Sequence, residues 1–154
     1  MLAMVNCVLS NSHCMNELIQ LELQESYCLP ILTYAFSGLR ADASQVRELN
    51  VCWNSVYRKI FHYNRWESVK CCINGMGRID LTHILAFQAL KFCRNLSQST
   101  NRILYNTFMC FKRECDYMFL LRTYSCTTTD SIGRLKGNVR EHYNSICAAR
   151  EVTG

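Results

Sequence analysis

The stretch DASQVRELNVCWNSVYRKIF, residues 42–61, decides the fold because it carries the clearest helical pattern in the chain. Asp42 followed three residues later by Gln45 is typical of a helix N-terminus at which the two side chains cap the backbone reciprocally. Apolar side chains then recur at steps of three and four residues, at Val46, Leu49, Trp53, Val56, Tyr57, Ile60 and Phe61. This spacing predicts an amphipathic helix with one buried face.

The basic residues of the same stretch define a second face. Arg47 and Arg58 are eleven residues apart, about three helical turns, so they share a face that Lys59 neighbours. Together with Arg65 they are our candidate nucleic-acid-binding residues, because guanidinium and ammonium groups hold phosphates.

The basic residues are also concentrated in the part of the chain after residue 50. Residues 1–50 hold two basic and five acidic side chains, whereas residues 51–154 hold fifteen basic and seven acidic ones. A basic half is typical of nucleic-acid binding. From charge alone, a solvated surface on a slightly basic protein is an equally weighted alternative.

Aromatic residues lie among these cations. A surface on which bases or sugars stack is one interpretation. Because Trp53, Tyr57 and Phe61 follow the apolar stripe, we assign those three to the core instead. The sequence leaves Tyr63 and Trp66 undecided between the two roles.

Outward from this helix, the chain reads as further helices separated by short breaks. One Pro and six Gly are too few turn-forming residues for an all-β fold with many tight turns. Helical patterns cover residues 15–29, 31–39, 64–73, 81–93, 103–121 and 132–149, with Pro30 kinking or interrupting the first pair and Asp80 capping the fourth. The predicted fold class is all-α, an irregular helical bundle of five to seven helices.

The cysteines indicate a compartment. Eleven are spread along the chain, an odd number, and Met1–Ser10 lacks the basic leader of a secretory signal. We therefore expect reduced thiols packed as small hydrophobes in an intracellular protein of the nucleus or cytoplasm. No apolar run reaches about 18 residues, so no membrane span is expected.

Metal and catalytic chemistry find little support. Cys110, Cys115, Cys126 and His142 lack the close paired spacing of a zinc site, so no metal ligand is predicted. None of the four histidines stands at a recognisable spacing from a nucleophile and an orienting carboxylate. We therefore predict no catalytic residue and no cofactor in this chain.

Three motifs follow one another in a fixed order: YCLPILTY at residues 27–34, LNVCWNSVYRK at residues 49–59 and WES at residues 66–68, with GMGR at residues 75–78 behind them. The series resembles the region just after the catalytic palm in reverse transcriptases of non-LTR (LINE-like) retrotransposons. The usual patterns there are Tyr-Cys-x-Pro-x-x-x-Tyr, Leu-x-Val-x-x-Asn-x-x-x-Arg and Trp-x-Ser. The likeness covers residues 12–98, and it departs at Ala35, where the family often has Gly.

The resemblance implies a thumb and post-thumb segment that grips an RNA–DNA template–primer duplex by its backbone. It divides the chain into a lead-in at residues 1–14, a thumb-like region at residues 15–98 and a C-terminal extension at residues 99–154. Arg58 matches the family pattern specifically and Lys59 more weakly. Arg47 and Arg65 rest on the shared-face argument alone.

The palm of such a polymerase would be a missing partner. It would need paired aspartates to hold two metal ions, and this chain has no Asp-Asp pair. Its four aspartates are scattered, at Asp42, Asp80, Asp116 and Asp130. The family's Mg²⁺ would sit in the missing palm, so we expect a fragment of an RNA-directed DNA polymerase that is inactive by itself.

The rival hypothesis is a non-enzymatic helical module for protein–protein interaction, with charge serving only solubility. A thumb separated from its palm should also expose apolar surface, which predicts self-association. Steep salt dependence of nucleic-acid binding would separate the two hypotheses.

Overall fold

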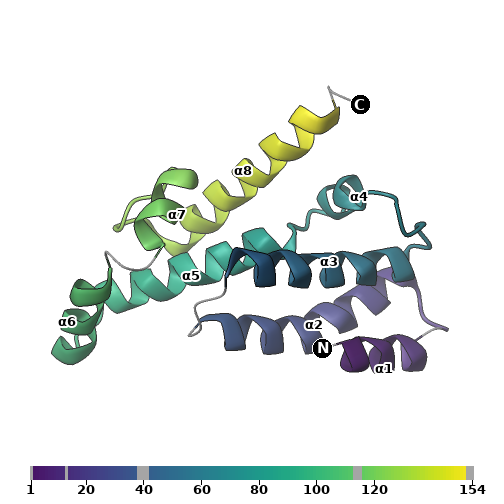
Figure 1. Ribbon diagram of the computed structural model, residues 1–154, viewed down its shortest axis with the longest axis horizontal. Helices are drawn as coiled ribbons and strands as arrows, with labels where there is room; N and C mark the ends of the chain where they lie inside the picture. The colour runs from purple at the N-terminus through teal and green to yellow at the C-terminus, as the bar shows by residue number, and fades with distance from the viewer. Residues whose placement is uncertain (1, 13, 38–41, 113–115, 152–154) are drawn as a thin grey trace. The chain divides into compact units, whose positions relative to one another are not determined.

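The computed structural model describes residues 2–12, 14–37, 42–112 and 116–151, which form eight α-helices and no strand (Figure 1). In chain order they are α1 (Leu2–Ser12), α2 (Glu17–Ser37), α3 (Ala43–Ile60), α4 (Lys70–Gly75), α5 (Leu81–Ser97), α6 (Arg102–Phe111), α7 (Tyr117–Thr123) and α8 (Ile132–Glu151). The predicted all-α class is confirmed. The helices outnumber the predicted five to seven.

The chain divides into two compact units, Met1–Thr82 and His83–Gly154, which are described separately. The division falls within the first turn of α5. The regions predicted from the sequence, residues 1–14, 15–98 and 99–154, follow motifs rather than packing and remain predictions.

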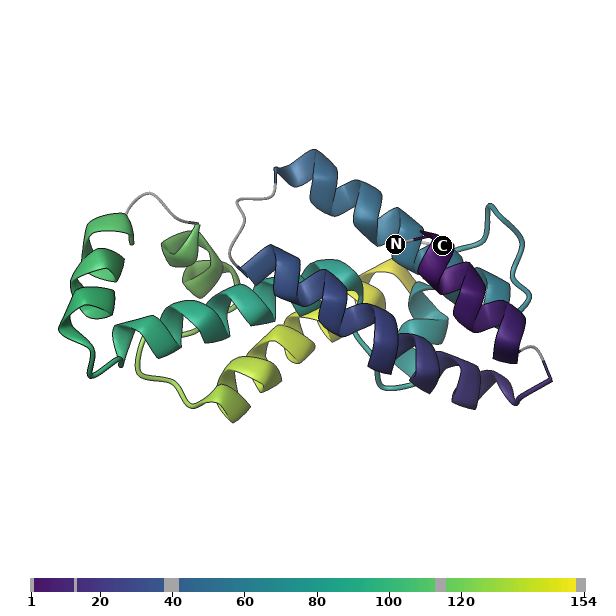
Figure 2. The same cartoon turned by 90° about the horizontal axis from the view of Figure 1, so that it is seen from below.

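In the first unit, α1, α2 and α3 pack side by side, as Figures 1 and 2 both show. Buried apolar side chains from α2, α3, α4 and the segment before α4 form its core: Leu21, Cys28, Leu32, Trp53, Val56, Tyr57, Ile60, Val69 and Ile73. The ring of Tyr57 meets Trp53 edge-on with centroids 6.3 Å apart and stacks on Phe61 at 6.5 Å. The core assignment of Trp53 and Tyr57 is therefore confirmed, while Phe61 is only half-buried.

The N-terminus of α3 has the predicted reciprocal cap. The Asp42 carboxylate accepts the Ser44 backbone N–H at 2.6 Å, and the Gln45 side-chain oxygen accepts the Asp42 backbone N–H at 3.2 Å. Two of the four backbone donors that a helix start leaves without intrahelical partners are thereby satisfied. The cap fixes where α3 begins and hence which residues share each of its faces.

Pro30 lies inside α2, so the predicted interruption between residues 15–29 and 31–39 is wrong, while the alternative that Pro30 kinks the helix stays a prediction. The proline removes one backbone donor and leaves the carbonyl of Ser26 without its helical partner. Ser26 and Pro30 are both exposed, so water can satisfy that carbonyl. The prediction that the second segment is buried is wrong for Ile31 and Tyr34, which are exposed, whereas Leu32 is in the core; the side chains of residues 35–39 lie outside the described part of the chain. Its predicted end, Gly38–Leu39, lies outside the described residues.

In the second unit, the long helix predicted at residues 103–121 is two helices, α6 and α7. The Phe108 ring meets the Tyr117 ring edge-on, with centroids 5.7 Å apart. Nine residues of continuous helix would separate these positions by about 13 Å. The chain must therefore change direction between them to bury both rings.

The core of this unit joins α5 and α7 to α8. Its buried side chains are Leu90, Leu121, Tyr124, Leu135, Val139, Tyr143 and Cys147. The loop between α7 and α8, predicted at residues 126–131, is confirmed and is held by the Asp130 carboxylate, which accepts the Thr127 backbone N–H at 2.7 Å. The hydrogen bond from Thr127 lowers the pKa of Asp130.

Candidate nucleic-acid interface

The candidate cations of α3 lie on two flanks of its buried stripe. At 100° per residue, Arg47 and Arg58 project within about 20° of each other, whereas Lys59 projects about 100° away from Arg58. Arg47 and Lys59 are exposed, and Arg58 is half-buried. The structure therefore places Arg47 and Arg58 on one flank and Lys59 on the other.

Arg58 ties α3 to the loop that follows it. Its Nε donates to the backbone carbonyl of Glu67 at 3.0 Å. Just after the end of α3, His62 takes a left-handed backbone conformation, with φ 56°. The Tyr63 backbone N–H then donates to the Arg58 carbonyl at 3.0 Å. Arg58 thus fixes the loop with both its backbone and its side chain.

A second turn shapes the middle of this loop, residues 61–69. The Glu67 carboxylate accepts the Asn64 backbone N–H at 2.7 Å and the Asn64 side-chain amide at 3.1 Å. These hydrogen bonds lower the pKa of Glu67. The sequence predicted a helix start at this Asn-x-x-Glu spacing, but α4 begins only at Lys70, because the two side chains close a turn here without a helix behind it.

Arg65 and Trp66 stand at the tip of this turn. Trp66 is 86% exposed, and the guanidinium carbon of Arg65 lies over its ring, 5.2 Å from the centroid. Tyr63 is exposed as well. The two aromatic residues that the sequence left undecided are therefore at the surface. Their exposure is set by the turn rather than by helical periodicity, so the spacing of apolar residues does not predict it.

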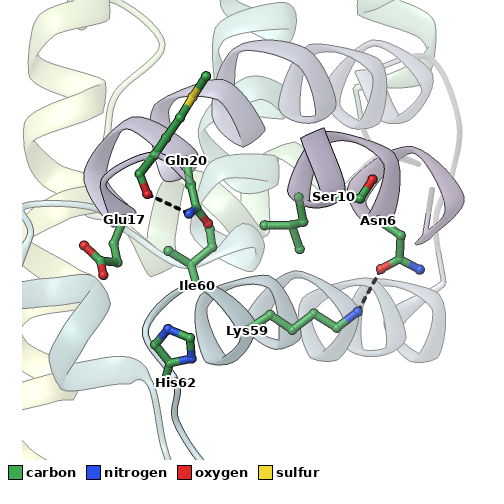
Figure 3. Close-up of a pocket in the computed structure, with 9 residues that line it drawn as sticks. Asn6, Ser10, Glu17, Gln20, Lys59, Ile60 and His62 are labelled. Carbon is green, nitrogen blue, oxygen red and sulfur yellow. Dashed lines mark hydrogen bonds between the residues drawn. The ribbon is translucent and has the colours of Figure 1, made fainter. Parts of the chain in front are cut away.

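Lys59 faces a cleft between α1, α2 and α3 (Figure 3). Its ammonium group donates to the Asn6 side-chain oxygen at 2.8 Å. The cleft has a volume of about 400 Å³, and Glu17 and His62 also line it. With a carboxylate in the same cleft and a hydrogen bond to α1, Lys59 is less available to a phosphate than Arg47 or Arg65.

Arg78, which follows α4, is used inside the first unit. Its Nη2 lies 3.2 Å from the Glu22 carboxylate, and its Nε lies 3.0 Å from the Glu25 carboxylate on the same helix, α2. The Tyr57 hydroxyl donates to Glu25 at 3.3 Å. The pKa of Glu25 is raised, because partial burial outweighs the neighbouring Arg78 charge. This network joins α2, α3 and the segment after α4 rather than serving a ligand.

In the second unit, two imidazoles meet. Nδ1 of His142 on α8 lies 3.4 Å from Nε2 of His83 on α5. The rings of Tyr124 and Tyr143 pack against His83. Burial, and then the His83 charge, lower the pKa of His142. This contact joins two helices of the unit, α5 and α8.

Within the described part of the chain, no group of three or more His, Cys, Asp or Glu side chains is placed to hold a metal ion. Cys115, one of the four residues weighed for zinc, lies outside the described residues. None of the helices that the structure describes is long and apolar enough to cross a membrane.

Comparison with family models, curated proteins and solved structures found no match to this chain.

Proposed function

We propose that the chain is a thumb and post-thumb segment of a non-LTR retrotransposon reverse transcriptase and that it holds the sugar-phosphate backbone of an RNA–DNA template–primer duplex. The motif order in residues 12–98 supports the family assignment. The observation that carries the binding role is the loop at residues 61–69, which Arg58 fixes to α3. On it Arg65 and Trp66 are presented to solvent, and Arg47 lies on the same flank of α3 as Arg58, about 17 Å away along the helix axis.

The proposed grip is electrostatic and independent of base sequence. Exposed cations on one side of a helix and its following loop attract phosphates and displace the counterions condensed on a duplex. Arg47 and Arg65 are exposed and supply this attraction most directly. Arg58 contributes mainly by fixing the loop, and Lys59 serves the neighbouring cleft. The chain carries no aspartate pair, so we assign it no polymerase activity by itself.

Binding to a short RNA–DNA hybrid, measured by fluorescence anisotropy over a range of salt concentrations, tests this function. We expect binding that weakens steeply as salt rises, because counterions are released on complex formation. Absence of binding to the hybrid at low salt would refute the proposed function.

A second candidate function, a protein–protein interaction module, is favoured by the surface of the second unit. Ile103 on α6 is 76% exposed and Phe119 on α7 is 68% exposed. On α6, Phe108 is the single buried residue among those whose side chains are described. Exposed apolar side chains on neighbouring helices favour association with another chain. Sedimentation and hybrid binding together test this candidate: it predicts association that persists at high salt and no affinity for the RNA–DNA hybrid at low salt, whereas a thumb separated from its palm would associate and also bind the hybrid.

We also propose that the chain works inside the cell, in the nucleus or cytoplasm. Its support is the set of cysteines, since none of the ten in the described residues is joined in a disulfide. Persistent free thiols are typical of reducing compartments.

A further inference from the structure

Trp66 is the largest side chain that the first unit leaves almost wholly exposed. Its indole has two faces, and the guanidinium of Arg65 lies over one of them, 5.2 Å from the ring centroid. At 86% exposure, most of the remaining ring surface is in contact with water. Leaving an indole hydrated is unfavourable compared with stacking it on another flat ring.

The loop holds this ring in place. The Asn64–Glu67 hydrogen bonds close the turn that contains Arg65 and Trp66. Arg58 secures the end of that turn through the Glu67 carbonyl. A ring presented on a fixed turn loses little conformational entropy when a partner binds, so it can stack at low cost.

The surrounding charge selects the kind of partner. Arg65 lies over the ring, and Arg58 and Lys70 stand at the two ends of the loop. Glu67 is the acidic residue among them, and its carboxylate is hydrogen-bonded to Asn64. The net charge of the loop is positive, so a flat partner that carries phosphates is favoured over a neutral one. Bases inside a duplex cover each other's faces and show only their edges in the grooves. A free π-face is offered by an unpaired base.

We propose that Trp66 stacks on an unpaired nucleobase of the template strand where it leaves the RNA–DNA duplex. This inference rests on the proposed function and deepens it, because it adds a contact to a base where the cations contact only phosphates. On this proposal the loop recognises the junction between paired and single-stranded nucleic acid.

The chain offers an unusually clean test, because it contains two tryptophans and Trp53 is fully buried. Intrinsic fluorescence changes on binding therefore report mainly on Trp66. The probes are two RNA–DNA hybrids whose RNA strands carry overhangs of equal length, one of uridines and one of abasic ribose residues, which carry the same phosphates. We expect quenching by the uridine overhang and about tenfold tighter binding to it than to the abasic overhang.

Two variants complete the test. Trp66→Leu should bind both hybrids equally, whereas Trp66→Phe should retain part of the preference, because a phenyl ring still stacks. Far-UV circular dichroism confirms that each variant is folded, which is expected for an exposed position. Equal affinity of the wild type for the two overhangs would overturn the stacking inference and leave backbone binding intact. Failure to bind either hybrid would overturn both.

Discussion

Replacement of Arg78 by Met should destabilise the first unit and should do so more at neutral than at acidic pH. The change keeps most of the aliphatic stem and removes the guanidinium that lies 3.0 Å from the Glu25 carboxylate and 3.2 Å from that of Glu22. Glu25 would retain the Tyr57 hydroxyl as a hydrogen-bond donor. A carboxylate in a half-buried site would then have lost its counterion.

The size of the effect follows from the exposure of the pair. Fully exposed ion pairs contribute up to about 1 kcal/mol, whereas removing one partner of a buried pair costs about 3–5 kcal/mol. The Arg78 side chain is 38% exposed and that of Glu25 is 20% exposed, so the pair lies between these cases and solvent screens it in part. We expect a loss of about 1–2 kcal/mol in the free energy of unfolding at neutral pH.

The pH dependence has a definite sign. The pKa of Glu25 is raised above its ordinary value of 4.5, first by burial, so the folded state favours the protonated carboxyl. Its contribution to stability is therefore full below that value and declines as pH rises through the raised pKa. Without Arg78 the pKa rises further. The deficit of Arg78→Met should consequently be smaller near pH 4 than near pH 7.

Urea denaturation followed by circular dichroism at the two pH values measures this deficit. Glu25→Gln is the matched variant, because it removes the charge and keeps an oxygen that can accept the Tyr57 hydrogen bond. A double-mutant cycle with Arg78→Met should give a coupling energy of about 1 kcal/mol. An equal deficit at both pH values, or no coupling, would refute the assignment of Arg78 as the counterion of Glu25.

Three further predictions concern the second unit. Gly137→Ala should raise the free energy of unfolding by about 0.5–1 kcal/mol, because Gly137 is helical and an added Cβ meets no atom within 4 Å. A lower free energy of unfolding in urea denaturation would contradict this. Ser125→Gly should also stabilise, by about 0.5–1 kcal/mol, because Ser125 has φ 49° just after α7, and an unchanged midpoint would indicate no strain there. His142 has a lowered pKa beside His83, so its contribution is full above the ordinary value of 6.5 and is lost as pH falls through the lowered pKa. His142→Gln should therefore flatten the fall in thermal midpoint between about pH 7 and 5, and an unchanged slope would exclude this contact as its source.

Helix α3 could be predicted from the sequence because its determinants are local. The Asp42 and Gln45 side chains cap backbone groups within three residues, and the buried stripe follows from periodicity alone. The loops after α5 and α7 were likewise predictable from runs of polar residues. These features need no knowledge of what packs against them.

The errors arise where a distant contact decides the outcome. The contact between Phe108 and Tyr117 brings together two side chains that one continuous helix would hold about 13 Å apart. Asn64 and Glu67 have the spacing of a helix start, yet Arg58 secures the segment as a loop. The positions of Trp66 and Lys59 follow from that loop and from α1, so periodicity could not place them.

The salt dependence of hybrid binding in paired charge variants tests the central claim most directly. Arg47→Ala with Arg65→Ala removes two exposed cations from the proposed interface, and Arg122→Ala with Lys136→Ala removes two exposed cations from the other unit. If Arg47 and Arg65 hold phosphates, the first pair should reduce the slope of log affinity against log salt by about 2, because each phosphate contact contributes about 1. The second pair should leave it unchanged. Equal slopes for both pairs would contradict the proposed interface.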